Sequence, residues 1–170
     1  MKKNAIITSA LEQRISLQKK QTINLNEWIF ENLNIRNDEN ILELCCGTGA
    51  QTKYLANYIT SGSLVCVDVN KESIAKAKSS INNKNVSFIA AEIDDTETYI
   101  DNNYDLIFSA YGFYYSKDPE LLHKKLRPNL NEKGRFVIVG PVLGNNAQLY
   151  NIGRQIGCEI LDAVVDGSEY

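Results

Sequence analysis

The sequence predicts an α/β fold, a doubly wound and mainly parallel sheet with helices on both faces. Short apolar runs alternate along the chain with segments whose apolar residues recur three and four positions apart, which are the patterns of buried strands and amphipathic helices. Each connection between two runs is long enough for a crossover helix, which parallel strands require.

The composition is that of one ordinary soluble domain. The chain has 170 residues, of which 44% are apolar and 23% charged, enough to bury a core. A formal net charge of -3 provides no basic field for a nucleic-acid backbone, so the expected partner is a small molecule and not a nucleic acid. No apolar run reaches the roughly 20 residues of a membrane span, and the N-terminus turns polar too soon for a secretory signal. We therefore expect a cytoplasmic protein without a membrane contact.

The first elements in the chain are helical. Residues 5–33 have helical spacing and predict two helices that part near residues 22–26. Arg14, Lys19 and Lys20 make the first helix basic, which is typical of a solvated face. A lid over a pocket is the alternative role for this helix.

Strands and helices then alternate. Strands are predicted over residues 41–45, 64–69, 86–90, 104–110 and 135–140, the last opened by Gly134. Helices are predicted over residues 52–59, 71–81, 119–127 and 145–156, with a short polar helix or loop around 94–99. Asn70 and Asp118 are good N-caps, the latter followed by Pro119 at the first turn, and Pro128 ends that helix.

A glycine turn follows the first strand, in the stretch "ILELCCGTGAQT". In a doubly wound sheet, ligands bind at the carboxyl ends of the strands, next to the point where the strand order reverses. Gly47 and Gly49 permit positive φ and let backbone N–H groups approach a ligand closely. A plain strand-to-helix connection can also use glycine for geometry alone, so the turn by itself is weak evidence.

Two acids make the turn more informative. Asp68 ends the second strand, where a carboxylate can accept hydrogen bonds from both ribose hydroxyls of an adenosine; its alternative role as a helix cap is already filled by Asn70. Glu43 lies four residues before Gly47, where it would repel a pyrophosphate but attract an ammonium or sulfonium group. The pattern favours a cationic adenosine compound over NAD.

Glu43, Cys45, Gly47 and Gly49 match the E/D-x-G-x-G-x-G signature of class I S-adenosylmethionine-dependent methyltransferases. The sequence resembles this family over residues 40–140. Cys45 replaces the first glycine of the signature, which makes close backbone approach harder without removing the turn.

The resemblance implies a set of residues that contact S-adenosylmethionine: Glu43, Cys45, Gly47, Thr48, Gly49, Asp68, Val69, Glu92, Ile93 and Ser109. Glu43 would orient the methionine amino group, residues 45–49 would pass beneath the methionine and ribose, and Asp68 would chelate the ribose hydroxyls.

The remaining contacts lie around the adenine and the sulfonium. Val69 and Ile93 would pack on the two faces of the adenine. Glu92 takes the place near the adenine amino group where the family usually has Asp, and Asp94 or Asp95 could serve instead. Ser109, with Ala110, would line the site with backbone groups near the sulfonium.

An aromatic cluster follows the fourth strand: Tyr111, Phe113, Tyr114 and Tyr115. Aromatic faces attract a sulfonium cation, although core packing is the commoner use of such residues, so we expect one or two of the four in the pocket. His123 stands among lysines on a helix and is expected at the surface. No catalytic residue is assigned, because methyl transfer from a sulfonium requires mainly alignment.

The cysteines indicate no metal centre. Cys45, Cys46, Cys66 and Cys158 lack the spacing of a zinc site. A disulfide between the adjacent Cys45 and Cys46 would be strained, so free buried thiols are predicted.

The resemblance implies a methyltransferase that acts on a small-molecule acceptor by in-line methyl transfer. The fourth strand is followed by "SAYG" and not by the "NPPY"-like tetrapeptide of nucleic-acid amino methyltransferases. Residues 1–36 would form a helical lid and residues 37–170 the S-adenosylmethionine-binding domain.

Two alternatives remain open, a non-catalytic adenosine- or partner-binding module and an NAD(P)-dependent oxidoreductase. The first alternative rests on the C-terminus. The family's sheet ordinarily ends with a hairpin of two more strands, and here only residues 158–165 could form one.

Overall fold

The structure of the chain is a computed structural model, which describes residues 22–141 and 147–158. By contacts the chain divides into two compact units, residues 1–138 and 139–170. The predicted first helix, with Arg14, Lys19 and Lys20, and the predicted last strand lie outside the described residues. The division into a lid and a binding domain stays a prediction.

The described elements alternate as predicted. In chain order they are α3 (Leu25–Asn32), β1 (Asn40–Leu44), α4 (Thr52–Tyr58), β2 (Ser63–Asp68), α5 (Lys71–Ser80), β3 (Val86–Ala90), η1 (Thr96–Thr98), β4 (Tyr104–Ala110), η2 (Phe113–Tyr115), α6 (Pro119–Leu126), η3 (Arg127–Asn129), β5 (Leu130–Val139) and α7 (Ala147–Gln155). Within the described residues no strand follows β5.

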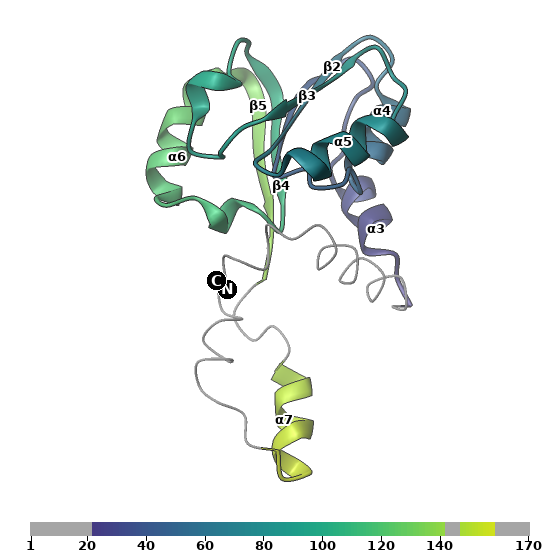
Figure 1. Cartoon of the computed structure of the whole chain (residues 1–170), viewed down its shortest axis with the longest axis vertical. Coiled ribbons are helices and arrows are strands. Elements are labelled where there is room, and N and C mark those ends of the chain that lie inside the picture. The colour runs from purple at the N-terminus through teal and green to yellow at the C-terminus, as the bar shows by residue number, and fades with distance from the viewer. Residues whose placement is uncertain (1–21, 142–146, 159–170) are drawn as a thin grey trace. The chain divides into compact units, whose positions relative to one another are not determined.

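The five strands form one sheet in the order β3-β2-β1-β4-β5. β1 pairs in parallel with both β2 and β4, and β2 pairs in parallel with β3. The chain therefore moves outward from β1 to β3 and then returns to the other side of β1, so that the order reverses between β1 and β4. Figure 1 shows α6 on one side of the sheet and α4 and α5 on the other. The doubly wound fold is confirmed.

The alternation of β1 separates its side chains between the two faces of the sheet. Leu42 and Leu44 join a buried cluster with Leu122 and Leu126 of α6. Glu43 points to the opposite face, where its Oε2 accepts a hydrogen bond from Thr52 of α4. Both faces of β1 are therefore covered, which explains why Ile41, Leu42, Glu43 and Leu44 are all buried.

The helix ends follow the predicted capping chemistry. The Asn70 side chain accepts from the backbone N–H groups of Glu72 and Ser73 at the start of α5. The Asp118 side chain accepts from Leu121 N, and Pro119 occupies the first turn of α6. Each cap pairs backbone donors that a helix leaves unsatisfied at its N-terminus.

β5 departs from the prediction, because it begins at Leu130 and contains Gly134, which we expected before the strand. The Asn131 side chain donates to Asp105 of β4 at 2.8 Å and anchors the early part of the strand. A Cβ at Gly134 would lie 2.9 Å from the carbonyl oxygens of Asn131 and Tyr104. The glycine permits a close backbone approach inside the strand and does not end it.

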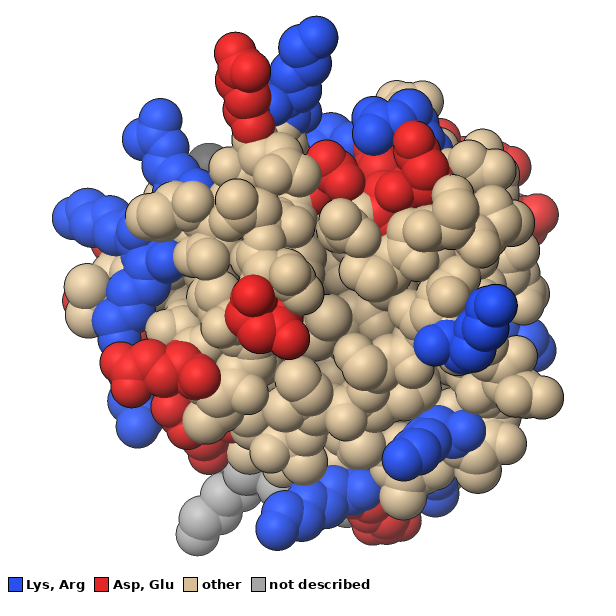
Figure 2. Space-filling model, turned by 90° about the horizontal axis from the view of Figure 1, so that it is seen from above, with Lys and Arg blue, Asp and Glu red and all other residues tan. Residues whose placement is uncertain are grey.

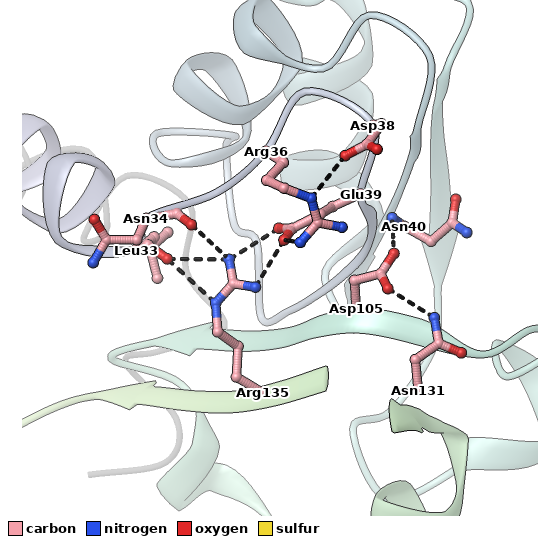
Figure 3. Close-up of polar contacts among 9 residues, drawn as sticks. All are labelled: Leu33, Asn34, Arg36, Asp38, Glu39, Asn40, Asp105, Asn131 and Arg135. Atoms are coloured by element: carbon pink, nitrogen blue, oxygen red, sulfur yellow. Dashed lines mark hydrogen bonds and ion pairs between the residues drawn. The ribbon is translucent and has the colours of Figure 1, made fainter. Parts of the chain in front are cut away.

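An ion-pair network around a buried carboxylate lies where β1 begins (Figure 3). Glu39 is fully buried, and its two carboxylate oxygens accept hydrogen bonds from Arg135 of β5 at 2.8 and 2.9 Å. Arg36 adds a third contact at 2.9 Å. Arg135 also donates to the carbonyl oxygens of Leu33 and Asn34. The network joins the segment after α3 to the edge strand.

Charges of both signs are dispersed over the surface. In the face shown in Figure 2, basic side chains stand mostly around the rim, and an acidic side chain lies near the middle among uncharged residues. None of the helices in the described part of the chain combines the length and the apolar character that a bilayer-spanning segment requires.

Candidate functional site

A cavity of about 430 Å³ opens at the carboxyl ends of the strands. It is lined by the turn after β1, the ends of β2 and β4, the residues that follow β3, and three residues of α3. This is the edge of the sheet where the strand order reverses, so the site lies where ligands bind in doubly wound folds.

The turn after β1 is built from left-handed backbone. Cys45, Gly47 and Gly49 have φ values of 59°, 56° and 85°. Glycine adopts this conformation without strain, whereas a side chain at Cys45 costs about 1 to 2 kcal/mol. The preference for glycine at this place in the signature thus has a direct conformational reason.

Gly112 makes room for the cysteine. A Cβ at Gly112 would lie 2.2 Å from the Cys45 Cβ and 2.8 Å from its Sγ. The Cys45 thiol donates to the Gly112 carbonyl oxygen at 3.5 Å. The turn after β1 and the turn after β4 are therefore packed directly against each other.

Asp68 is held by backbone donors on both carboxylate oxygens. Its Oδ2 accepts from Gly47 N and its Oδ1 from Asn70 N, both at 2.8 Å. The pKa of Asp68 is raised by burial, and these two bonds oppose the shift. Each oxygen keeps a lone pair for a further donor. The carboxylate lines the cavity in a fixed orientation, as required for pairing with two hydroxyls.

Glu43 lines the cavity but is only 2% exposed. Its Oε2 accepts from Thr52 Oγ1 at 2.7 Å and from the Cys66 thiol at 3.7 Å. Burial raises the pKa of Glu43 to about 7, and nearby Asp68 adds to the rise against the two side-chain hydrogen bonds. Burial thus disfavours the charged form of Glu43, and a cation in the cavity would favour it.

The three acidic residues that follow β3 differ in their surroundings. Glu92, Ile93 and Asp94 line the cavity, whereas Asp95 is not among the lining residues. Asp94 accepts hydrogen bonds from the Ser116 hydroxyl and from Lys117 N. The carboxylate of Asp94 therefore holds the loop after β4, and Glu92 remains available to a ligand.

Eight of the ten expected cofactor contacts line the cavity: Glu43, Cys45, Gly47, Thr48, Asp68, Val69, Glu92 and Ile93. Gly49 and Ser109 do not. A Cβ at Gly49 would meet the Ala77 and Ile81 side chains at 3.1 and 3.0 Å, so this glycine allows the turn to pack on α5. Ser109 is fully buried and donates to Leu44 O at 3.1 Å, which joins β4 to β1.

The aromatic cluster divides between the cavity and the core. Tyr111, Tyr114 and Tyr115 line the cavity, one more than the largest number expected. Phe113 is buried against Phe136, with ring centroids 5.4 Å apart. Tyr111 has a φ of 56°, a strained conformation for a residue other than glycine and one that gathers at functional sites. His123 is exposed, as predicted, and stands outside the cavity lining.

The sequence did not identify the residues that α3 and its neighbours contribute. Leu25, Asn26 and Ile29 line the cavity from α3, and Gln51 and Lys117 line it from two loops. Helical spacing predicted α3, but no signal in the sequence showed which part of it would lie against the glycine turn.

The thiols are free, as predicted, but not all are buried. Cys46 and Cys66 are buried, Cys45 is partly buried and Cys158 is exposed. Cys158 follows the short helix α7, whose Ile152 is also exposed. Burial raises the pKa of the Cys66 thiol, which keeps it protonated. In the part of the chain that the structure describes, no group of three or more Cys, His, Asp or Glu side chains could hold a metal ion.

The sheet, the turn after β1 and the acid that ends β2 are together those of a class I, Rossmann-like methyltransferase. Comparison with known families agrees. Residues 35–165 match the family model described as "Methyltransferase domain", and the chain belongs to this family.

Curated relatives include malonyl-[acyl-carrier protein] O-methyltransferase 2 of Coxiella burnetii, which is 32% identical over 111 residues, 65% of this chain and 44% of the relative. Nodulation protein S of Azorhizobium caulinodans is 32% identical over 122 residues, 70% of this chain and 56% of the relative. The chain thus spans only about half the length of these relatives.

Similar solved structures carry SAH. Coclaurine N-methyltransferase, bound to N-methylheliamine and SAH, has a TM-score of 0.61 at 22% identity, which covers 70% of this chain and 37% of that one. The plantazolicin methyltransferase in complex with SAH has a TM-score of 0.58 at 25% identity, which covers 64% and 41%. At 22% identity, the likeness to coclaurine N-methyltransferase shows a shared fold alone.

Proposed function

We propose that the chain transfers a methyl group from S-adenosylmethionine to a small-molecule acceptor. The observation that carries this proposal is Asp68, fixed by two backbone donors on the wall of a cavity that also holds the glycine turn. A cavity of about 430 Å³ is within the range of small-ligand sites.

The polar groups of the cavity suit the parts of this donor. Asp68 at the end of β2 would accept from the ribose hydroxyls and Glu92 beyond β3 from the adenine amino group, since both residues line the cavity. Val69, which is 43% exposed, offers an apolar surface to the ring. On the β1 side the cavity is lined by the acidic Glu43 and not by a basic residue. An acid at this place favours a cationic ligand over a pyrophosphate.

The chain's contribution to the reaction is alignment. The bound sulfonium supplies a methyl group with a neutral leaving group. The turn after β1 and Asp68 hold the donor, and the tyrosines after β4 stand where an acceptor would meet it. Holding two reactants in line contributes several kcal/mol to catalysis, and Tyr faces stabilise a desolvated cation by about 0.5 to 2 kcal/mol. The lining includes no histidine, so the proposal assigns no general base.

We propose that the acceptor is a small molecule, which is either free or attached to a carrier. The names of the curated relatives support this, since several are malonyl-[acyl-carrier protein] O-methyltransferases. Tyr111, Tyr114 and Tyr115 provide flat surfaces beside the reacting centre for an organic acceptor.

Isothermal titration with S-adenosylmethionine, S-adenosylhomocysteine and NADH tests the proposal. We expect heat of binding for the first two and none for NADH. Binding of NADH alone would support the oxidoreductase alternative, and folded protein that binds none of the three would exclude the proposed donor.

The variant Asp68→Ala tests the assigned ribose contact. We expect its affinity for S-adenosylhomocysteine to fall by about 1.5 to 3 kcal/mol, the usual cost of losing hydrogen bonds to a charged group. Asp95→Ala, which changes an exposed acid outside the cavity lining, is the matched control and should bind as the wild type does. Equal affinity in all three proteins would show that the ribose lies elsewhere.

A further inference from the structure

The charged residues of the cavity lining come from different parts of the fold. The acids line it from β1, from the end of β2 and from the segment after β3: Glu43, Asp68, Glu92 and Asp94. Within the part of the chain that the structure describes, Lys117 is the one basic residue of the lining. It belongs to the loop of residues 111–118 between β4 and α6, which the proposed donor contacts do not use.

The backbone of Lys117 is fixed, and its ammonium group is left for another partner. The two carboxylate oxygens of Asp94 accept hydrogen bonds from the Ser116 hydroxyl and from Lys117 N, the latter at 2.9 Å. Among residues 22–141 and 147–158, no carboxylate lies within ion-pair distance of the Lys117 ammonium group. A positive charge on a cavity wall without a counter-ion attracts an anionic ligand.

Aromatic surfaces accompany this cation in the same loop. Tyr111, Tyr114 and Tyr115 line the cavity, and the rings of Tyr114 and Tyr115 pack with their centroids 4.7 Å apart. Tyr111 directly follows β4 and keeps a side chain at a φ of 56°, where glycine would be less strained. The loop therefore offers flat faces together with one positive charge, which suits a ligand with an apolar body and an anionic group.

We propose that the methyl acceptor carries an anionic oxygen group, a carboxylate or a phosphate, which binds the ammonium group of Lys117 while the tyrosines contact the rest of the molecule. This inference rests on the proposed function and narrows its acceptor to anionic small molecules. The donor also has a carboxylate, at its methionine end. That end is assigned to the turn after β1, whereas Lys117 is tied to Asp94 beyond β3.

The experiment measures the binding of four probes by NMR titration to the protein saturated with S-adenosylhomocysteine. Each probe contains one benzene ring. Phenylacetate and phenyl phosphate are anions, phenylacetamide is neutral and 2-phenylethylamine is a cation. We expect each anion to bind about fivefold or more tightly than phenylacetamide, and the cation to bind most weakly. The tighter of the two anions distinguishes a carboxylate from a phosphate as the group that the site prefers.

Variants of Lys117 test whether its charge is the cause. Lys117→Met keeps most of the length of this exposed side chain, and we expect it to lose the preference for anions while its affinity for phenylacetamide stays within twofold. Lys117→Glu should reverse the order and favour 2-phenylethylamine. Lys124→Met, which changes an exposed lysine of α6 outside the cavity lining, is the matched control and should bind all four probes as the wild type does. A thermal melt of each variant establishes that it is folded.

Three outcomes would overturn the inference. The first is a wild type without a preference for anions, through equal affinities or through no binding of any probe. The second is a preference for anions that persists in Lys117→Met. The third is a loss of fivefold or more in the affinity of Lys117→Met for S-adenosylhomocysteine but not for 5′-methylthioadenosine, which would assign the ammonium group to the carboxylate of the donor. Failure of the wild type to bind S-adenosylhomocysteine would instead contradict the proposed function, and the same four probes are then titrated into the free protein.

Discussion

At the scale of single residues, Glu43 shows how a buried carboxyl group that lines a cavity can cost stability. The carboxyl group is buried beside Asp68 and has a pKa of about 7 instead of 4.5. The folded state therefore binds this proton more tightly than the unfolded state does. The contribution of Glu43 to stability is fully present below pH 4.5 and is lost as the pH rises to 7.

Glu43→Gln should remove this pH dependence. Without ligand, we expect the variant to be more stable than the wild type at pH 8, by up to about 3 kcal/mol, because a neutral amide needs no charge in the cavity. Urea unfolding at pH 5 and at pH 8 measures the effect, and the difference between the two proteins should shrink at pH 5.

The same substitution should weaken S-adenosylhomocysteine, whose ammonium group favours the charged form of Glu43. In the wild type this affinity should rise between pH 6 and pH 8. A stability difference that is the same at pH 5 and pH 8 would show that Glu43 does not titrate in this range.

At the scale of elements, the site depends on contact between two turns. Cys45 directly follows β1 and has a left-handed backbone conformation. Gly112, which follows β4, leaves the space that the Cys45 side chain fills. Gly112 cannot gain a side chain while Cys45 keeps its own, because the would-be Cβ of Gly112 lies 2.2 Å from that of Cys45.

Gly112→Ala should therefore be destabilising by about 1 to 3 kcal/mol, the usual cost of overpacking a core. The double variant Cys45→Gly with Gly112→Ala should recover most of this loss, because the clashing side chain is gone and the nearest remaining contact is Ser109 Oγ at 3.3 Å. Urea unfolding of the single and double variants measures the coupling. Losses that simply add would show that the two turns are independent.

At the scale of the whole molecule, the strands are joined at the end away from the cavity by an ion pair between the buried Glu39 and the partly exposed Arg135. Arg135 of β5 binds both oxygens of Glu39, which precedes β1 (Figure 3). The two residues are 96 positions apart in the sequence. A pair with a fully buried carboxylate adds little net stability but is expensive to break, since the buried charge then keeps fewer partners.

Arg135→Met should lower the free energy of unfolding by about 3 kcal/mol, because Glu39 stays buried with only Arg36 as its partner. Lys133→Met, at an exposed position of the same strand, is the control and should have little effect. Comparable losses in both variants, measured by urea unfolding, would mean that the pair is not the cause.

Local chemistry explains why so much of the fold was predictable. Asn70 and Asp118 cap α5 and α6 through bonds to backbone groups two or three residues away, and Pro119 stands in the first turn. The apolar residues Ile41, Leu42 and Leu44 indicate burial on both faces of the sheet. Interactions of this kind join residues that are close in the sequence, so the local sequence predicts them.

Contacts between distant segments were not predictable in this way. Gly134 was expected before β5, yet the pairing of Asn131 with Asp105 brings it into the strand. Ser109 was expected to line the site through its backbone, and no local pattern showed that its hydroxyl bonds Leu44 across the sheet. In both cases a partner from another strand determined the outcome.

The sequence by itself determined the doubly wound fold, the glycine turn and the acids Glu43 and Asp68, because strand period, capping and turn chemistry act over short distances. Only the tertiary structure decided that α3 contributes Asn26 beside Gln51, that Gly112 accommodates Cys45, and that Arg135 neutralises Glu39. Each of these pairs joins residues at least 25 positions apart. Their contact depends on how the helices and strands pack, which no local pattern encodes.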